Sequence, residues 1–287
     1  MLQAQRKATP GLTIALCHPI LGAMQDISHL TARSRVAPSR ARMILATDLD
    51  GTFLGGTHSQ RAQLYEWLRA HADAVALFFV TGRDPAAIVD ICADGFVPAP
   101  CHVVGDVGTT IATFDGRAVT PIPELEAEIA ETWGDRAAAL RAAIAPIQSL
   151  REQDTPFRYR LSYHYDASFH PDQVAHLSEL GVDVLISHGR FVDILPRGIS
   201  KGPSLLRLLD HLGVAPERVL VAGDTLNDLS MFQTGLHGAV VGGAEAELLD
   251  AVAPLPRAHV CKAIGAAGII EAIHAHGLHP EPPEVPS

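Results

Sequence analysis

The sequence has no excess of basic residues and no apolar run long enough to cross a membrane. Its 287 residues include 22 Lys and Arg against 32 Asp and Glu, a formal net charge of −10. This balance argues against broad nucleic-acid binding, because phosphate backbones attract basic surfaces, but it allows a small anionic substrate at a local positive site. The longest apolar stretch, Gly11–Met24, falls short of the roughly 18 residues of a spanning helix and contains His18 and Pro19. We therefore expect no nucleic-acid partner and no membrane insertion.

The sequence also has little cysteine. The four cysteines are scattered, and no pair has the spacing of metal ligands: Cys17, Cys92, Cys101 and Cys261. A chain of this length that is 47% hydrophobic can build a core without disulfide bonds. We expect reduced thiols in the core and a cytoplasmic location.

The N-terminal stretch differs in charge from the rest. Residues 1–47 hold six basic residues and one acid, Asp26, which gives a net charge of +5 (6 − 1). Arg6, Lys7 and the apolar segment after them suggest a signal peptide, but no clear small-residue cleavage site follows. We interpret residues 1–42 as a flexible extension. A targeting segment and a mis-assigned start remain open alternatives.

Short apolar runs alternate with helical patterns along most of the chain. The runs do not alternate polar and apolar residues, which is typical of strands buried on both faces of a parallel sheet. The expected strands are Met43–Leu49, Ala74–Val80, His102–Val104, Arg218–Ala222 and Gly238–Val241. The expected helices are Gln60–Ala72, Pro85–Ala93, Pro203–Leu212, Leu226–Gln233 and Glu245–Val252. This order predicts an α/β fold with a doubly wound parallel sheet.

The alternation breaks in the middle of the chain, where we expect a second, smaller α+β domain inserted into the first. The break has a helical run at Glu124–Leu150, a strand-like Tyr159–Tyr165, a helical Pro171–Leu180 and strand-like Val182–Ser187 and Phe191–Leu195. The predicted domains are a core of residues 43–120 and 197–278 and an insert of residues 121–196. Residues 279–287, rich in Pro and Glu, are expected to be disordered.

Polar motifs follow several of the expected strands at their carboxyl ends, where open α/β sheets bind ligands. The motifs are Asp48-Leu49-Asp50-Gly51-Thr52, Thr81-Gly82-Arg83, Ser200-Lys201-Gly202 and Gly223-Asp224-Thr225-Leu226-Asn227-Asp228. Four carboxylates that converge would repel one another unless a cation and Lys201 share the site. Hard oxygen ligands favour Mg²⁺ over Zn²⁺. Together with an anion-accepting hydroxyl, these groups suggest phosphoryl transfer.

These four motifs, in this order, resemble those of the haloacid dehalogenase-like (HAD) superfamily, over roughly residues 43–277. The insert resembles the Cof-type (C2) cap of phosphatases in that superfamily. Further segments look like sucrose-phosphate phosphatases and related glycosyl-phosphate phosphatases. These segments are Val107-Gly108-Thr109, Arg160-Leu161-Ser162-Tyr163 and Asp193-Ile194-Leu195-Pro196, followed by Lys201. The cap run has His164 and Tyr165 where those relatives tend to be more aliphatic or aromatic.

The resemblance implies a role for each matching residue. Asp48 would be the nucleophile, and Asp50 would protonate the leaving sugar oxygen and then activate water. Thr81, Gly82, Arg83 and Lys201 would bind the phosphoryl group. Mg²⁺ would be held by Asp48, Asp50 (through its carbonyl), Asp224, Asn227 and Asp228. Arg160, Ser162, Tyr163 and His164 of the cap would contact the sugar.

The expected activity is a Mg²⁺-dependent phosphatase acting on a small sugar phosphate, such as a disaccharide or glycosyl-polyol phosphate. A glycosyltransferase acting upstream is a candidate partner. Two other functions stay open: a non-catalytic sugar-phosphate sensor that regulates a glycosyltransferase, and a sugar phosphomutase. Each motif also has a structural explanation when taken alone, since Asp-Gly is a common turn signal and a lone lysine is usually at the surface.

Overall fold

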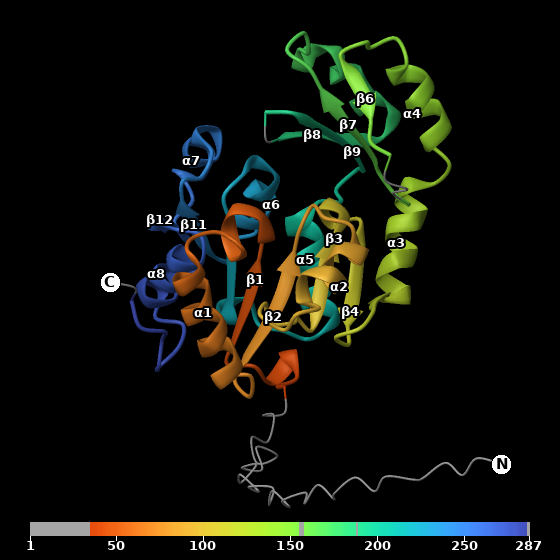
Figure 1. Cartoon of the computed structure of the whole chain (residues 1–287). Coiled ribbons are helices and arrows are strands. Elements are labelled where there is room, and N and C mark those ends of the chain that lie inside the picture. The colour runs from red at the N-terminus through yellow and green to blue at the C-terminus, as the bar shows by residue number, and fades with distance from the viewer. Residues whose placement is uncertain (1–34, 155–157, 188, 286–287) are drawn as a thin grey trace, which may run out of the picture. The chain divides into compact units, whose positions relative to one another are not determined.

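The computed structural model describes residues 35–154, 158–187 and 189–285 (Figure 1). Most of the strands form one eight-stranded sheet. In chain order these are β1 (Met43–Thr47), β2 (Val75–Val80), β3 (His102–Gly105), β4 (Thr110–Phe114), β5 (Val119–Pro121), β10 (Val219–Gly223), β11 (His237–Gly242) and β12 (Ala258–Ile264). Their order across the sheet is β12-β11-β10-β1-β2-β3-β4-β5, parallel from β12 to β3 and antiparallel at β4 and β5.

Helices cover both faces of this sheet (Figure 1). One face packs against α1 (His58–Ala70), α2 (Pro85–Cys92) and α8 (Ala266–His276). The other packs against α3 (Pro123–Trp133), α5 (Lys201–His211), α6 (Leu229–Phe232) and α7 (Ala246–Val252). β1 and β2 are buried at every position, and apart from Thr47 all their residues are apolar. The predicted doubly wound α/β fold is confirmed.

The register of the central strands brings three of the predicted motifs together. Thr47 at the end of β1 lies opposite Ala222 of β10 and Phe79 of β2. The chain leaves all three strands at the same end of the sheet, so the residues that follow them lie side by side. This is the crevice in which open α/β sheets place ligands.

The second sheet is antiparallel and belongs to the insert, as predicted. It consists of β6 (Leu150–Glu152), β7 (Leu161–Tyr165), β8 (Val182–Ser187) and β9 (Phe191–Pro196), in the order β6-β7-β9-β8. Its core contains Trp133, Leu140, Leu161, Tyr163 and Leu177. We call this second sheet and the helices packed on it the cap.

The helices of the insert differ from the predicted ones. The run expected over Glu124–Leu150 divides into α3 and α4 (Ala137–Ile144), because Gly134 has a φ of +58° and ends α3. The segment Pro171–Leu180 forms two short 3₁₀ helices in place of one α-helix.

The predictions for the two chain ends concern residues 1–42 and 279–287. The prediction of a flexible N-terminal extension falls, for residues 1–34, outside the described residues, and Ala41 is buried in the core. Disorder of residues 279–287 stays a prediction, and residues of this segment contact α1 and α8. Trp67 Nε1 donates to the Glu281 carbonyl at 2.8 Å, and His279 is buried. Among the described residues, no helix has both the length and the apolar character needed to cross a bilayer.

Candidate active site

Asp48 is the first residue after β1, and the loop that follows can be formed only around glycine. Gly51 has a φ of +77°, which side chains other than glycine rarely adopt. A Cβ atom on Gly51 would also lie 2.2 Å from the Asp224 Oδ2 atom. The turn therefore brings the Asp48–Thr52 loop directly against the residues after β10.

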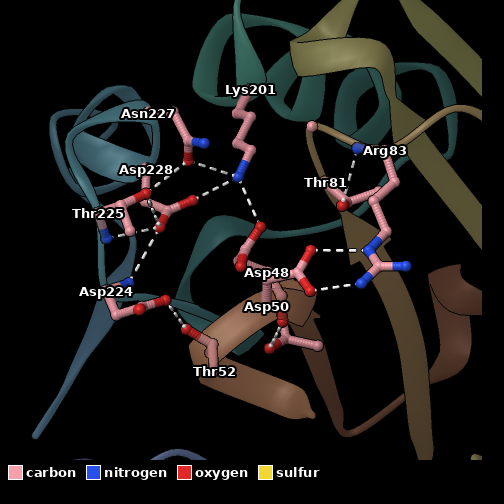
Figure 2. A network of polar contacts seen from close by, with 12 residues as sticks. Asp48, Asp50, Thr52, Thr81, Arg83, Lys201, Asp224, Thr225, Asn227 and Asp228 are labelled. Carbon is pink, nitrogen blue, oxygen red and sulfur yellow. Dashed lines mark hydrogen bonds and ion pairs between the residues drawn. The ribbon is translucent and has the colours of Figure 1, made fainter. Parts of the chain in front are cut away.

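Lys201 joins the motifs into one cluster. It is the first residue of α5, and its side chain is fully buried. Its ammonium donates to Asp48 Oδ1 at 2.6 Å, to Asp228 Oδ1 at 2.6 Å and to Asn227 Oδ1 at 2.7 Å (Figure 2). An ammonium group has three donors, and here all three are used. Burial lowers the pKa of Lys201, but the Asp228 and Asp48 carboxylates outweigh it and raise that pKa above its ordinary value.

Asp48 is held in a buried, acidic environment. Burial raises the pKa of Asp48 to about 8, although Lys201 opposes the rise and Asp228 adds to it. Burial likewise raises the pKa of Asp224 to about 6. A further cation beside these groups would favour their ionised forms. The cluster thus has more acidic groups than Lys201 alone can neutralise.

Asp224 and Asp228 hold different positions in the cluster. Asp228 Oδ2 accepts the backbone N–H groups of Asp224 and Thr225, each at 3.0 Å, which fixes its orientation. Asp224 Oδ1 accepts from the Thr52 hydroxyl at 2.6 Å. One carboxylate oxygen each from Asp48, Asp224 and Asp228 lies within 4.8 Å of the others, a donor set that could hold a metal ion.

Asp50 lies apart from the lysine cluster. Its carboxylate is half exposed and receives two hydrogen bonds from Arg83, Nε to Oδ2 at 2.7 Å and Nη2 to Oδ1 at 2.5 Å (Figure 2). The hydrogen bond to Asp50 is the main reason that the pKa of Arg83 rises. Arg83, predicted as a phosphate ligand, lines the cavity and is hydrogen-bonded to Asp50. Thr81 is buried, and its hydroxyl accepts from the Arg83 amide at 3.2 Å.

A cavity of about 440 Å³ opens over these groups. The larger sheet and its loops contribute Asp48, Asp50, Gly82, Arg83, Val107 and Asn227 to its lining. The cap contributes Gln153, Arg160, Ser187, Arg190, Phe191 and Asp193. Of the cap residues predicted to contact a sugar, only Arg160 is in this lining.

The four predicted cap residues separate according to the pleat of β7. Ser162 donates to Asp193, beside Arg160. Tyr163 points to the opposite face, into the core of the cap, where it is buried. His164 is exposed and lies 5.2 Å from the Phe191 ring, between ring centroids. Because successive side chains of a strand alternate between faces, one continuous run cannot all face the cavity.

Arg160 connects the cap to the loop after β2. Its side chain is 4% exposed, and its guanidinium donates to the Gly82 carbonyl at 3.0 Å and to Asp193 Oδ1 at 3.3 Å. Asp106 Oδ1 lies 3.7 Å from the same guanidinium. Asp106 and Val107 have φ values of +51° and +58°, a conformation that is strained for residues other than glycine. This buried ionic cluster fixes the cap strand next to the Thr81-Gly82-Arg83 loop.

Several cavity residues were not predicted from the sequence as site residues. They are Gln153, Ser187, Arg190, Phe191 and Asp193. Asp193 could have been identified from the sequence, because it is an acid inside the otherwise apolar strand β9. The structure shows that it is buried there. The other residues lie at or next to strand ends, and nothing in their sequence pattern sets them apart.

Comparisons with known proteins agree with this geometry. Residues 41–277 match the family model described as sucrose-6F-phosphate phosphohydrolase. A glucosylglycerol-phosphate synthase of Pseudomonas anguilliseptica is 38% identical over 239 residues, which cover 82% of this chain and 31% of that protein. Sucrose-phosphatase 2 of Nicotiana tabacum is 30% identical over 260 residues, covering 84% of this chain and 61% of the relative.

A solved structure has the same architecture. It is the sucrose-phosphatase of Synechocystis sp. PCC6803 in complex with sucrose and phosphate, with a TM-score of 0.75 and 26% identity. The match covers 83% of this chain and 98% of that one. The chain spans 31%, 61% and 64% of the length of three curated relatives that it matches.

Proposed function

Because the chain belongs to the sucrose-6F-phosphate phosphohydrolase family of HAD-type phosphatases, we propose that it hydrolyses a glycosyl phosphate with the help of Mg²⁺. The substrate class is a disaccharide phosphate or a glycosyl-polyol phosphate, in keeping with the names of the relatives. One observation carries this proposal: Lys201 joins acids from separate segments at the floor of a cavity that the cap completes. Such a site can hold a phosphoryl group at the floor of the cavity and a sugar next to the cap.

The acidic cluster fits a hard divalent cation. Asp48 and Asp224 would hold Mg²⁺, with Asp228 and Asn227 beside them, because their donor atoms are all oxygens. Asp228 already accepts from Lys201 and two backbone amides, so its part is to fix the positions of its neighbours. When bound, Mg²⁺ would offset negative charge on the phosphoryl oxygens.

Asp48 is the group placed to attack phosphorus. Its carboxylate oxygen would form a bond to phosphorus while the bond between phosphorus and the sugar oxygen breaks, which leaves an aspartyl-phosphate. Lys201, 2.6 Å from Asp48 Oδ1, would stabilise the charge that develops on the phosphoryl oxygens. Water then attacks phosphorus, and Asp48 is released with inorganic phosphate.

Asp50 is placed to move the proton in both steps. It would protonate the departing sugar oxygen and later take a proton from the attacking water. Two hydrogen bonds from Arg83 hold its carboxylate at the cavity wall. Arg83 would therefore act through the orientation of Asp50.

The test is phosphate release by the full chain from a panel of sucrose 6-phosphate, glucosylglycerol phosphate and glucose 6-phosphate, with Mg²⁺ or with EDTA. We expect release from a glycosyl phosphate only with Mg²⁺, and none from D48N. D250N changes an exposed aspartate in α7 in the same way and should behave as the wild type. Normal turnover by D48N would contradict the nucleophile assignment.

The same assay separates the two alternatives. A sensor would bind a sugar phosphate stoichiometrically and release no phosphate. A phosphomutase would return an isomerised sugar phosphate. A glycosyltransferase upstream of this reaction would supply the substrate, and a coupled assay with both proteins would detect that relation.

A further inference from the structure

A second group of metal-ligating side chains lies at the edge of the large sheet. His259 and Cys261 are on the edge strand β12, and Glu271 is on α8, which packs against it. One ligand atom from each of the three lies within 4.8 Å of the other two. None of them belongs to the lysine cluster or lines the cavity above it. The arrangement brings together nitrogen, sulfur and oxygen donors.

The local structure directs all three side chains to the same point. His259 and Cys261 are two residues apart on a strand, so they share a face, while Val260 between them is exposed. His259 Nε2 lies 3.2 Å from Glu271 Oε1. The other oxygen of Glu271, Oε2, accepts the amides of Lys262 and Ala263, each at 3.0 Å, and the Lys262 amide also lies 3.2 Å from Oε1. These amides fix the carboxylate beside the histidine, as outer-shell partners of metal ligands do.

We propose that His259, Cys261 and Glu271 form a binding site for Zn²⁺ that is separate from the phosphoryl-transfer site. Imidazole, thiolate and carboxylate together suit Zn²⁺, whereas the all-oxygen cluster suits Mg²⁺. Three protein ligands leave one tetrahedral position for water. The ion would link the edge strand β12 to α8.

Cys261 is the ligand that a metal would change most. The residue is 5% exposed, and its thiol donates to the Gly268 carbonyl at 3.2 Å. Burial, with a smaller effect of Glu271, raises its pKa to about 12, so the free thiol keeps its proton. Coordination through sulfur would displace that proton. Without a metal, His259 contacts Glu271 next to the buried Cys261 thiol.

Cobalt provides a direct test, because a thiolate bound to Co²⁺ gives a charge-transfer band that oxygen ligands do not give. We would strip the full chain with a chelator and titrate it with Co²⁺, then displace Co²⁺ with Zn²⁺. The wild type should develop the band with one equivalent and lose it when Zn²⁺ is added. C261S should not develop it. H259Q and E271Q should weaken Co²⁺ binding at least about tenfold.

Two controls separate this site from the rest of the protein. C92S removes a half-buried cysteine of α2, and D224N damages the acidic cluster, yet both should keep the band. Zn²⁺ should raise the melting temperature of the wild type but not of H259Q, because only a folded site binds it.

If C261S does not fold, H259Q and E271Q carry the test, since both positions are partly exposed. Absence of the band in the wild type, its persistence in C261S, or unchanged binding by both H259Q and E271Q would overturn the proposal.

Discussion

At the scale of single residues, Lys201 organises the site. A fully buried lysine is stable only when its charge is matched, and here three side-chain oxygens surround the ammonium within 2.7 Å. The same bonds fix Asp48 relative to Asp228, two residues far apart in the sequence. The position of Asp48 and the stability of the site therefore depend on one side chain.

Substitution of Lys201 should affect both activity and stability. K201M leaves two buried carboxylates without their cation, which we expect to lower the free energy of unfolding by about 3 kcal/mol. Loss of the charge beside the phosphoryl group should lower kcat at least about 100-fold. Urea unfolding and phosphate release measure the two effects. K262M, at an exposed lysine, is the matched control, and an effect of equal size there would contradict the account.

Arg83 should affect catalysis with little effect on stability. R83Q removes both hydrogen bonds that orient Asp50, so we expect kcat to fall about tenfold or more. The ion pair is half exposed, and its loss should change the free energy of unfolding by less than about 1 kcal/mol. R83K keeps the charge but not the paired geometry and should be intermediate. A normal kcat for R83Q would show that Asp50 needs no such support.

At the scale of elements, the cap is attached to the large sheet through Arg160. This residue directly precedes β7 and reaches the Gly82 carbonyl after β2, while Asp193 of β9 and Asp106 neutralise it. A residue of the cap is thereby fixed next to the loop that follows Thr81. We infer that this cluster keeps the cavity in shape for the sugar.

Substitution of Arg160 tests whether it holds the cap on the large sheet. R160M leaves Asp193 and Asp106 buried without a cation, so we expect a loss of about 3 kcal/mol in stability. KM should rise because the cavity loses its shape. R197M changes an exposed arginine that follows β9 and should behave as the wild type. Wild-type KM and stability for R160M would contradict this role.

The strands and the position of the polar motifs beside them could be predicted from the sequence because both depend on local patterns. β1 and β2 are runs of almost entirely apolar residues, and the acids Asp48 and Asp224 directly follow β1 and β10. Other features depend on contacts between distant segments. In the sequence, Arg83 is a cationic residue beside Thr81 and Gly82 and was interpreted as an anion ligand. Only the fold shows its hydrogen bond to Asp50. β12 is partly exposed, and its sequence mixes polar and apolar residues, so the sequence pattern does not indicate a strand there.

At the scale of the whole molecule, the C-terminal segment of the described chain makes contacts that its composition does not suggest. A tail rich in Pro and Glu is typical of disorder, yet Trp67 and His274 donate hydrogen bonds to the carbonyls of Glu281 and Pro283. In each contact a side chain of a helix donates to a backbone carbonyl of the tail. Contacts of this kind depend on the fold and cannot be read from composition.

Stability of the molecule should depend on pH through His102. Burial, with a smaller effect of the charge on His211, lowers the pKa of His102 to about 4 from its ordinary value of 6.5. The unfolded chain therefore takes up a proton below about pH 6.5, where the folded chain does not until about pH 4. Between pH 7.5 and 5 this group should lower the free energy of unfolding by about 2 kcal/mol.

The variant H102Q isolates this contribution, because all other groups remain. We would compare urea unfolding of the wild type and H102Q at pH 7.5 and pH 5. The wild type should lose about 2 kcal/mol more than H102Q over this interval. Equal losses in the two proteins would show that His102 titrates normally in the folded state.

The most direct test of the central claim is to find where the phosphoryl group is carried. D50N should form the aspartyl-phosphate but hydrolyse it slowly, so incubation with Mg²⁺ and p-nitrophenyl phosphate, an acid quench and peptide mass spectrometry should locate a phosphoryl group on Asp48. D48N treated in the same way should carry none. Steady turnover of this substrate by the wild type, with no phosphoryl group on Asp48 in either wild type or D50N, would contradict the account.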